Sequence, residues 1–109
     1  MSYDCNLEIA LVEGDCSEIE AKKPEILKQL ADDGIHSDVY SDLKDAFTLG
    51  RANFRVHPFY LLQLLDSVAT LLPAVAFDAR GLGEAFRDTW IAEYRKGQRV
   101  FSQGPWDEA

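Results

Sequence analysis

The feature that most constrains the fold is a long apolar segment at residues 59–72, which directly follows Pro58. Proline suits the first position of a helix, and neither glycine nor proline interrupts the segment. Ten of its fourteen residues are apolar, whereas a helix on a single sheet needs an apolar stripe of only about 100°. The polar residues fall on one narrow stripe: Gln63, Asp66, Ser67 and Thr70. The segment therefore predicts a helix that is either buried between two layers or partly exposed for a partner.

The same segment is the chain's nearest approach to a membrane span. Its polar residues argue against insertion, because one aspartate near the centre of a span costs about 2.5–3.5 kcal/mol. The N-terminus also lacks the basic region and apolar core of a secretory signal. We therefore expect a cytoplasmic protein that does not bind a membrane.

Shorter patterns on either side predict an α+β protein. Alternating apolar residues at 7–12 predict a strand, and residues 17–20 match a capping box before a helix that begins again at Pro24. Residues 35–41 and 47–56 predict two strands, and residues 74–79 predict a buried one. This β-α-β-β-α-β order is that of ferredoxin-like domains. We expect one α+β domain over residues 1–109, with two helices on one face of a mainly antiparallel sheet.

The segment 84–95 fits two patterns. Its aromatic residues are four apart, as on a helix, but Trp90, Ala92 and Tyr94 also alternate, as in a strand. Lys96-Gly97 and the apolar residues beyond it predict a C-terminal β-hairpin that closes on the glycine. We expect the hairpin, and a helix is the alternative.

The two cysteines are predicted to be reduced. If the chain between Cys5 and Cys16 is extended at about 3.3 Å per residue, the thiols lie roughly 30 Å apart, beyond disulfide reach. No further cysteine or histidine falls at metal-ligand spacing, so we expect no metal site.

The acidic charge lies in the first half of the chain. The net charge is −8, and residues 1–50 hold twelve acids and four bases, whereas residues 51–109 hold seven of each. This balance argues against binding to nucleic acid or to an anionic membrane surface, both of which attract basic residues. An acidic surface can instead steer a basic protein. The candidate partner-binding residues are Glu13, Asp15, Glu18, Glu20, Asp32, Asp33, Asp38, Asp42 and Asp45. The alternative is charge that is spread over several loops and serves solubility.

Residues 78–84 suggest a second candidate site. Two glycines separated by one residue would let backbone amides approach an anion, with arginines as charged partners. The candidate ligand pocket comprises His57, Arg80, Arg87 and Trp90. The third glycine of a dinucleotide fingerprint and the Lys-Ser/Thr of a P-loop are absent, so no cofactor is expected. The alternative is a turn whose charges pair with one another.

Three functions follow from these patterns. A small non-enzymatic interaction module, such as an immunity or inhibitor protein that masks a cationic nuclease-type toxin, fits the size, the charge and the lack of catalytic motifs. A small-molecule sensor or enzyme would use the candidate ligand pocket. A homo-oligomeric structural domain, as simple as a homodimer, would pair through an open face of its sheet.

Overall fold

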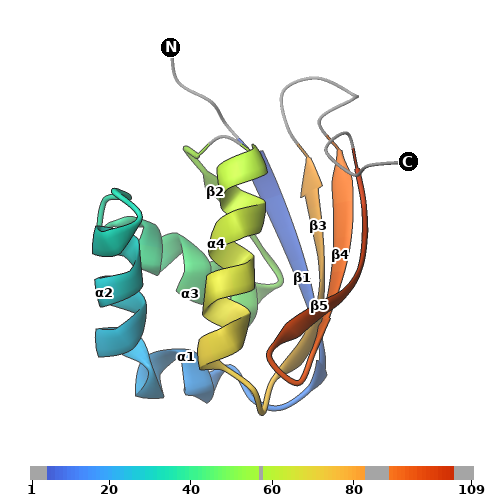
Figure 1. Ribbon diagram of the computed structural model, residues 1–109, viewed down its shortest axis with the longest axis horizontal. Coiled ribbons are helices and arrows are strands. Elements are labelled where there is room, and N and C mark those ends of the chain that lie inside the picture. The colour runs from blue at the N-terminus through green and yellow to red at the C-terminus, as the bar shows by residue number, and fades with distance from the viewer. Residues whose placement is uncertain (1–4, 57, 83–88, 105–109) are drawn as a thin grey trace.

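Four helices cover one face of a five-stranded antiparallel sheet (Figure 1). The computed structural model describes residues 5–56, 58–82 and 89–104, with the backbone alone at 58 and 59. The strands lie in the order β2-β1-β3-β4-β5. The elements in chain order are β1 (Cys5–Glu13), α1 (Ser17–Ala21), α2 (Lys23–Asp32), α3 (Val39–Leu49), β2 (Arg51–Phe54), α4 (Pro58–Leu71), β3 (Ala76–Leu82), β4 (Trp90–Arg95) and β5 (Gln98–Gln103). The predicted α+β class and the antiparallel sheet are confirmed.

Helix α4 is buried between two layers. In Figure 1 it lies between the sheet and α2, and α2 contacts both α3 and α4. At 100° per residue its buried side chains cover an arc of about 160°, wider than one sheet needs: Leu61, Leu62, Leu64, Leu65, Val68 and Ala69. Tyr60 is the exception, with 58% of its surface exposed. The wide apolar face predicted from the sequence is thus explained by burial.

Two predicted strands are wrong or too long. Residues 35–38 form a loop with a turn at 37–38, residues 39–49 form α3, and β2 begins only at Arg51. The apolar residues of this segment recur at helical spacing and point into the core: Val39, Tyr40, Leu43, Ala46 and Phe47. Three helices therefore separate β1 from β2, so the described residues form four helices where the sequence predicted two, and the ferredoxin-like order is not confirmed.

Several local predictions are confirmed. The chain breaks between α1 and α2 at Lys22, and Pro24 lies in the first turn of α2. The predicted capping box at residues 17–20 is wrong, because the N-cap of α1 is Cys16 and no side chain caps this helix. The Asp15 carboxylate accepts a hydrogen bond from the Ser17 backbone N–H over 3.0 Å, just before the helix. Cys16 is a free cysteine. No helix in the described part of the chain is long and apolar enough to cross a membrane.

The C-terminal hairpin is also confirmed. Strands β4 and β5 pair antiparallel, so residues 90–95 are a strand and not a helix; residues 84–88 lie outside the described ranges. Lys96 and Gly97 both have positive φ angles, of 53° and 78°. A two-residue turn with two positive φ angles matches the twist of the flanking strands.

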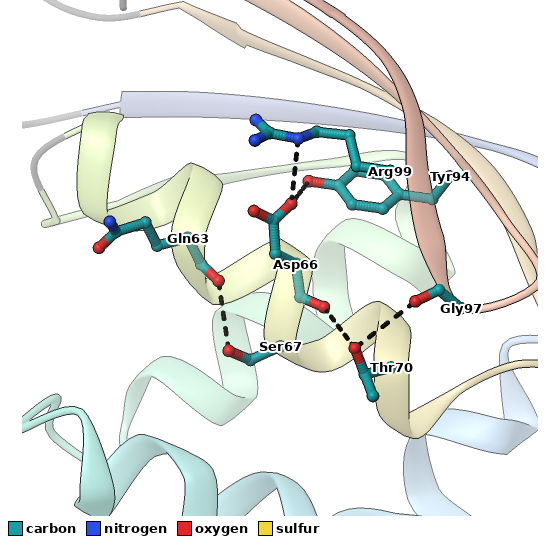
Figure 2. Close-up of polar contacts among 7 residues, drawn as sticks. All are labelled: Gln63, Asp66, Ser67, Thr70, Tyr94, Gly97 and Arg99. Carbon is teal, nitrogen blue, oxygen red and sulfur yellow. Dashed lines mark hydrogen bonds and ion pairs between the residues drawn. The ribbon is translucent and has the colours of Figure 1, made fainter.

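The polar stripe of α4 fastens this hairpin to the helix (Figure 2). The Tyr94 hydroxyl donates a hydrogen bond to Asp66 Oδ1 over 2.7 Å, and Arg99 Nε lies 3.5 Å from the same oxygen. The Thr70 hydroxyl lies 3.5 Å from the Gly97 carbonyl oxygen. Burial and the Asp66 hydrogen bond both raise the pKa of Tyr94 far above its usual range.

We expect Tyr94→Phe to lower the free energy of unfolding by about 1.5 kcal/mol, because it removes a hydrogen bond to a charged group. Tyr40→Phe is the comparison, since its buried hydroxyl donates to the neutral Ile19 carbonyl over 3.3 Å and should contribute about 0.5–1 kcal/mol. Urea unfolding of both variants measures the difference. A smaller loss for Tyr94→Phe than for Tyr40→Phe would contradict the role given to Asp66.

Candidate functional site

Two adjoining cavities form an open groove between α3, α4, the α2–α3 connection and the end of β2. Their volumes are about 670 and 660 Å³, and they share Gly34, Ile35 and Val56. We call them together the acidic groove. Its lining residues are Asp33, Gly34, Ile35, His36, Asp38, Val39, Asp42, Asn53, Arg55, Val56, Tyr60, Gln63, Asp66 and Ser67.

The acidic groove combines an apolar part with an acidic one. Ile35, Val39 and Val56 supply apolar surface near its middle. Four of its residues are aspartates (33, 38, 42 and 66), whereas Arg55 is its one arginine and it contains no lysine. Such a surface favours a ligand that carries positive charge beside an apolar group.

The surroundings of Asp42 in the acidic groove disfavour its ionised form. Partial burial and the nearby carboxylates of Asp45 and Asp38 raise its pKa above the ordinary value, and Arg55 lowers it by less. Asp42 forms no ion pair with any described residue. The ionised carboxylate is therefore poorly compensated by the protein itself.

His36 does not compensate the acids while it is neutral. Its Nδ1 accepts a hydrogen bond from the Asp38 backbone N–H over 3.1 Å, so this nitrogen carries no proton in that arrangement. The same Nδ1 lies 3.4 Å from Asp38 Oδ2, which makes an ion pair only when the ring is protonated.

The structure brings some of the sequence-predicted acids together and separates others. Asp33, Asp38 and Asp42 line the acidic groove, and Asp45 lies close enough to Asp42 to raise its pKa. Asp32 is exposed at the end of α2. The other predicted acids lie at or near α1, which Figure 1 shows at the opposite end of α2 from the α2–α3 connection: Glu13, Asp15, Glu18 and Glu20. Glu20 forms an ion pair with Lys44, which lowers the pKa of Glu20.

The predicted ligand pocket is not assembled by the described residues. Strand β3 continues through Gly81 to Leu82, so Arg80 lies in a strand and not in a glycine-rich turn. Arg80 points to the uncovered face of the sheet, where its Nε donates to Glu8 Oε1 over 2.6 Å. Trp90 pairs in register with Gly81 and is buried on the helix side, with 2% exposed. Arg80 and Trp90 therefore lie on opposite faces of the sheet, and His57 and Arg87 lie outside the described residues.

The missing side chain of Gly81 leaves space for the Trp90 ring, and not for the anion that the sequence suggested. A Cβ atom at this position would lie 2.2 Å from the Trp90 ring carbon Cε2, which no real contact allows. The indole therefore lies over the glycine, as in sheets where a strand glycine marks close approach. The Trp90 Nε1 atom is buried without a hydrogen-bond partner among the described residues.

Sequence reasoning missed the remaining residues of the acidic groove. The sequence places Ile35, Arg55 and Val56 in predicted strands and Tyr60 in the long helix, and nothing in these patterns indicates that the four residues line one groove. The one usable signal was the polar stripe of the long helix, because Gln63 and Ser67 on that stripe line the groove. Within residues 5–56, 58–82 and 89–104, no three His, Cys, Asp or Glu side chains are grouped to hold a metal ion.

Comparison with known proteins gives no relative: no protein-family model, curated protein or solved structure matches the chain. The case for a function therefore depends on the geometry and charge of the acidic groove.

We expect the stability of Asp42→Asn, relative to the parent protein, to increase between pH 3 and pH 6. The folded protein raises the pKa of Asp42 above its ordinary value of 3.8, so ionisation costs the folded state more than the unfolded state. That cost is absent at low pH, where the carboxyl is protonated in both states, and is complete above the raised pKa. Asparagine removes it.

Urea unfolding at the two pH values measures this change. Glu13→Gln is the control, because Glu13 is exposed at the end of β1 and carries the same charge. If the stability of Asp42→Asn relative to the parent stays constant or decreases over this pH range, the folded protein does not disfavour the ionised form of Asp42.

Proposed function

We propose that the chain is a small non-enzymatic interaction module whose acidic groove binds a basic segment of a partner protein. The observation that carries this proposal is the composition of the groove, in which four aspartates and one arginine surround apolar side chains. A basic segment supplies the positive charge that this composition lacks, and its aliphatic stems can cover the apolar side chains of the groove.

The surroundings of Asp42 favour a partner with positive charge. Its carboxylate is partly desolvated, is repelled by Asp38 and Asp45, and forms no ion pair with any described residue. A guanidinium or ammonium group placed beside it would relieve this repulsion in the complex. Such a partner would bind more tightly, because it stabilises a carboxylate whose ionisation destabilises the free protein.

The apolar part of the groove favours a partner with long basic side chains. Long basic side chains carry aliphatic stems that cover apolar surface while the charged end stays hydrated. Ile35 and Val56 can receive such a stem, and the exposed ring of Tyr60 stands beside them as a surface for an arginine to stack on. The net charge of −8 would speed the encounter with a cationic protein.

An immunity or inhibitor protein is the class that best fits this proposal. Such a protein would cover the active site of a cationic nuclease-type toxin with an acidic surface of its own. It would act in the cytoplasm, where cysteine thiols stay reduced. The size of the chain and its charge support this assignment.

The proposal predicts that a cationic amphipathic peptide binds in the acidic groove. The probe is a fluorescein-labelled peptide of alternating arginine and leucine, and fluorescence anisotropy gives its Kd. We expect the double variant Asp38→Asn/Asp42→Asn to weaken binding about tenfold, which corresponds to about 1.4 kcal/mol. Binding should also weaken as salt is added.

The matched control is Glu13→Gln/Glu18→Gln, which removes the same charge at the other end of the molecule. It should change the Kd by less than about twofold, because exposed charges more than a Debye length away are screened. Equal losses in both double variants would mean that net charge alone attracts the peptide, and the groove would have no special role. The same pair of variants can then be tested on any cationic protein encoded beside this one.

A further inference from the structure

Strand β2 lies at one end of the sheet and pairs with β1 alone. In an antiparallel pair of strands, hydrogen-bonded and non-hydrogen-bonded residue pairs alternate. The Ile9 backbone N–H donates to the Gly50 carbonyl oxygen over 2.9 Å. This pair continues the β1–β2 register and so fixes which of the following pairs are hydrogen-bonded. Arg51 and Asn53 fall in non-hydrogen-bonded pairs, so their backbone N–H and C=O groups point away from β1.

The outward backbone groups of Arg51 and Asn53 form what we call the free edge of β2. No backbone hydrogen bond joins them to any other described residue. Proteins often block such an edge with proline, lysine or a β-bulge. β2 contains neither proline nor lysine, and its register with β1 is regular. The strand at the other end of the sheet, β5, has a shift in its register with β4, so β2 is the edge better suited to accept another strand.

The acidic groove reaches the free edge of β2. Asn53 lines the groove together with Val39 and Asp42 of α3. The side chain of Asn53 lies on the sheet face that no helix covers, because the next residue, Phe54, is buried on the helix side. On that uncovered face Asn53 Nδ2 donates to Asn6 Oδ1 over 3.0 Å. Asn53 therefore borders the groove at the edge of the strand, where its N–H and C=O groups point.

We propose that the basic segment of the partner binds as an extended strand that pairs with the free edge of β2. This inference rests on the proposed function, because the charge of the acidic groove is what identifies the occupant as basic. Strand addition to a sheet edge is a general mode of peptide recognition, in which backbone hydrogen bonds give affinity and alternate side chains give specificity. The bound segment extends the five-stranded sheet by one strand.

Strand pairing determines which side chains of the segment meet the acids. Successive side chains of a strand point to opposite faces of the sheet. One set points to the helix side, where Asp38 and Asp42 line the groove. The other set points to the face that carries the side chain of Arg51, opposite Glu8. The proposal therefore favours basic residues at every second position, because half of a run of adjacent basic residues would approach Arg51.

Two N-methylated forms of the arginine–leucine peptide test the strand pairing. One form is methylated at every arginine amide and the other at every leucine amide, so the two forms carry the same charge and the same side chains. In an added strand, the amides of one set point to β2 and those of the other set point to solvent. We expect one form to bind at least about tenfold more weakly than the other, because methylation removes its hydrogen bonds to β2. Fluorescence anisotropy gives both Kd values.

Amide hydrogen exchange gives a second measurement, on the protein itself. The N–H groups of Arg51 and Asn53 point away from β1, so they should exchange at least about tenfold more slowly once the unmodified peptide is bound. Ala52 is the matched control, because its N–H points to Leu7 of β1 in the free protein already. Its exchange rate should change less than those of its two neighbours.

Equal Kd values for the two methylated peptides, or unchanged exchange at Arg51 and Asn53 in the complex, would overturn the strand pairing. The proposed function stands in that case if Asp38→Asn/Asp42→Asn still weakens binding of the unmodified peptide. It fails if that double variant binds the unmodified peptide as tightly as the parent protein does. The failure of the strand pairing is therefore distinguished from the failure of the proposed function.

Discussion

Helix α4 carries more apolar surface than a single sheet can cover, and the arrangement of the rest of the chain follows from this. The sheet covers one side of α4, and α2 covers the opposite side as a further layer (Figure 1). Because every helix is used on this side, no helix is left for the second face of the sheet. The α2–α3 connection must also pass from the outer layer to α3, and it borders the acidic groove as it does so. The burial of α4 thus determines both where the acidic groove lies and which face of the sheet stays uncovered.

The polar stripe of α4 is divided between two tasks. Asp66 and Thr70 hold the C-terminal hairpin, so that the buried Tyr94 hydroxyl has a charged acceptor (Figure 2). Gln63 and Ser67 line the acidic groove. The polar stripe is narrow because both the sheet and α2 pack against apolar side chains of α4. The few polar residues that remain contact the C-terminal hairpin or line the acidic groove.

Sequence reasoning predicted the elements whose local signals agree with their tertiary environment. The long helix, the break at Lys22 and the Lys96-Gly97 turn all belong to this class. It failed over residues 35–49, where Ile35, Val39 and Tyr40 have high β-propensity but belong to a loop and a helix. It also predicted a loop at Gly81, because nothing local shows that the Trp90 indole lies where a Cβ atom of residue 81 would be. The acidic groove joins residues 33–42, 53–56 and 60–67, and only the tertiary packing of α2, α3 and α4 brings these segments together.

The central claim is that a basic segment binds between the α2–α3 connection and α4. Amide chemical shifts of the isotopically labelled protein, followed while the arginine–leucine peptide is added, test it most directly because they locate the contact. The account predicts that the largest shifts fall at residues 33–42, 53–56 and 60–67 and disappear as salt is added. Shifts concentrated on α1 or on the sheet face that no helix covers would contradict it.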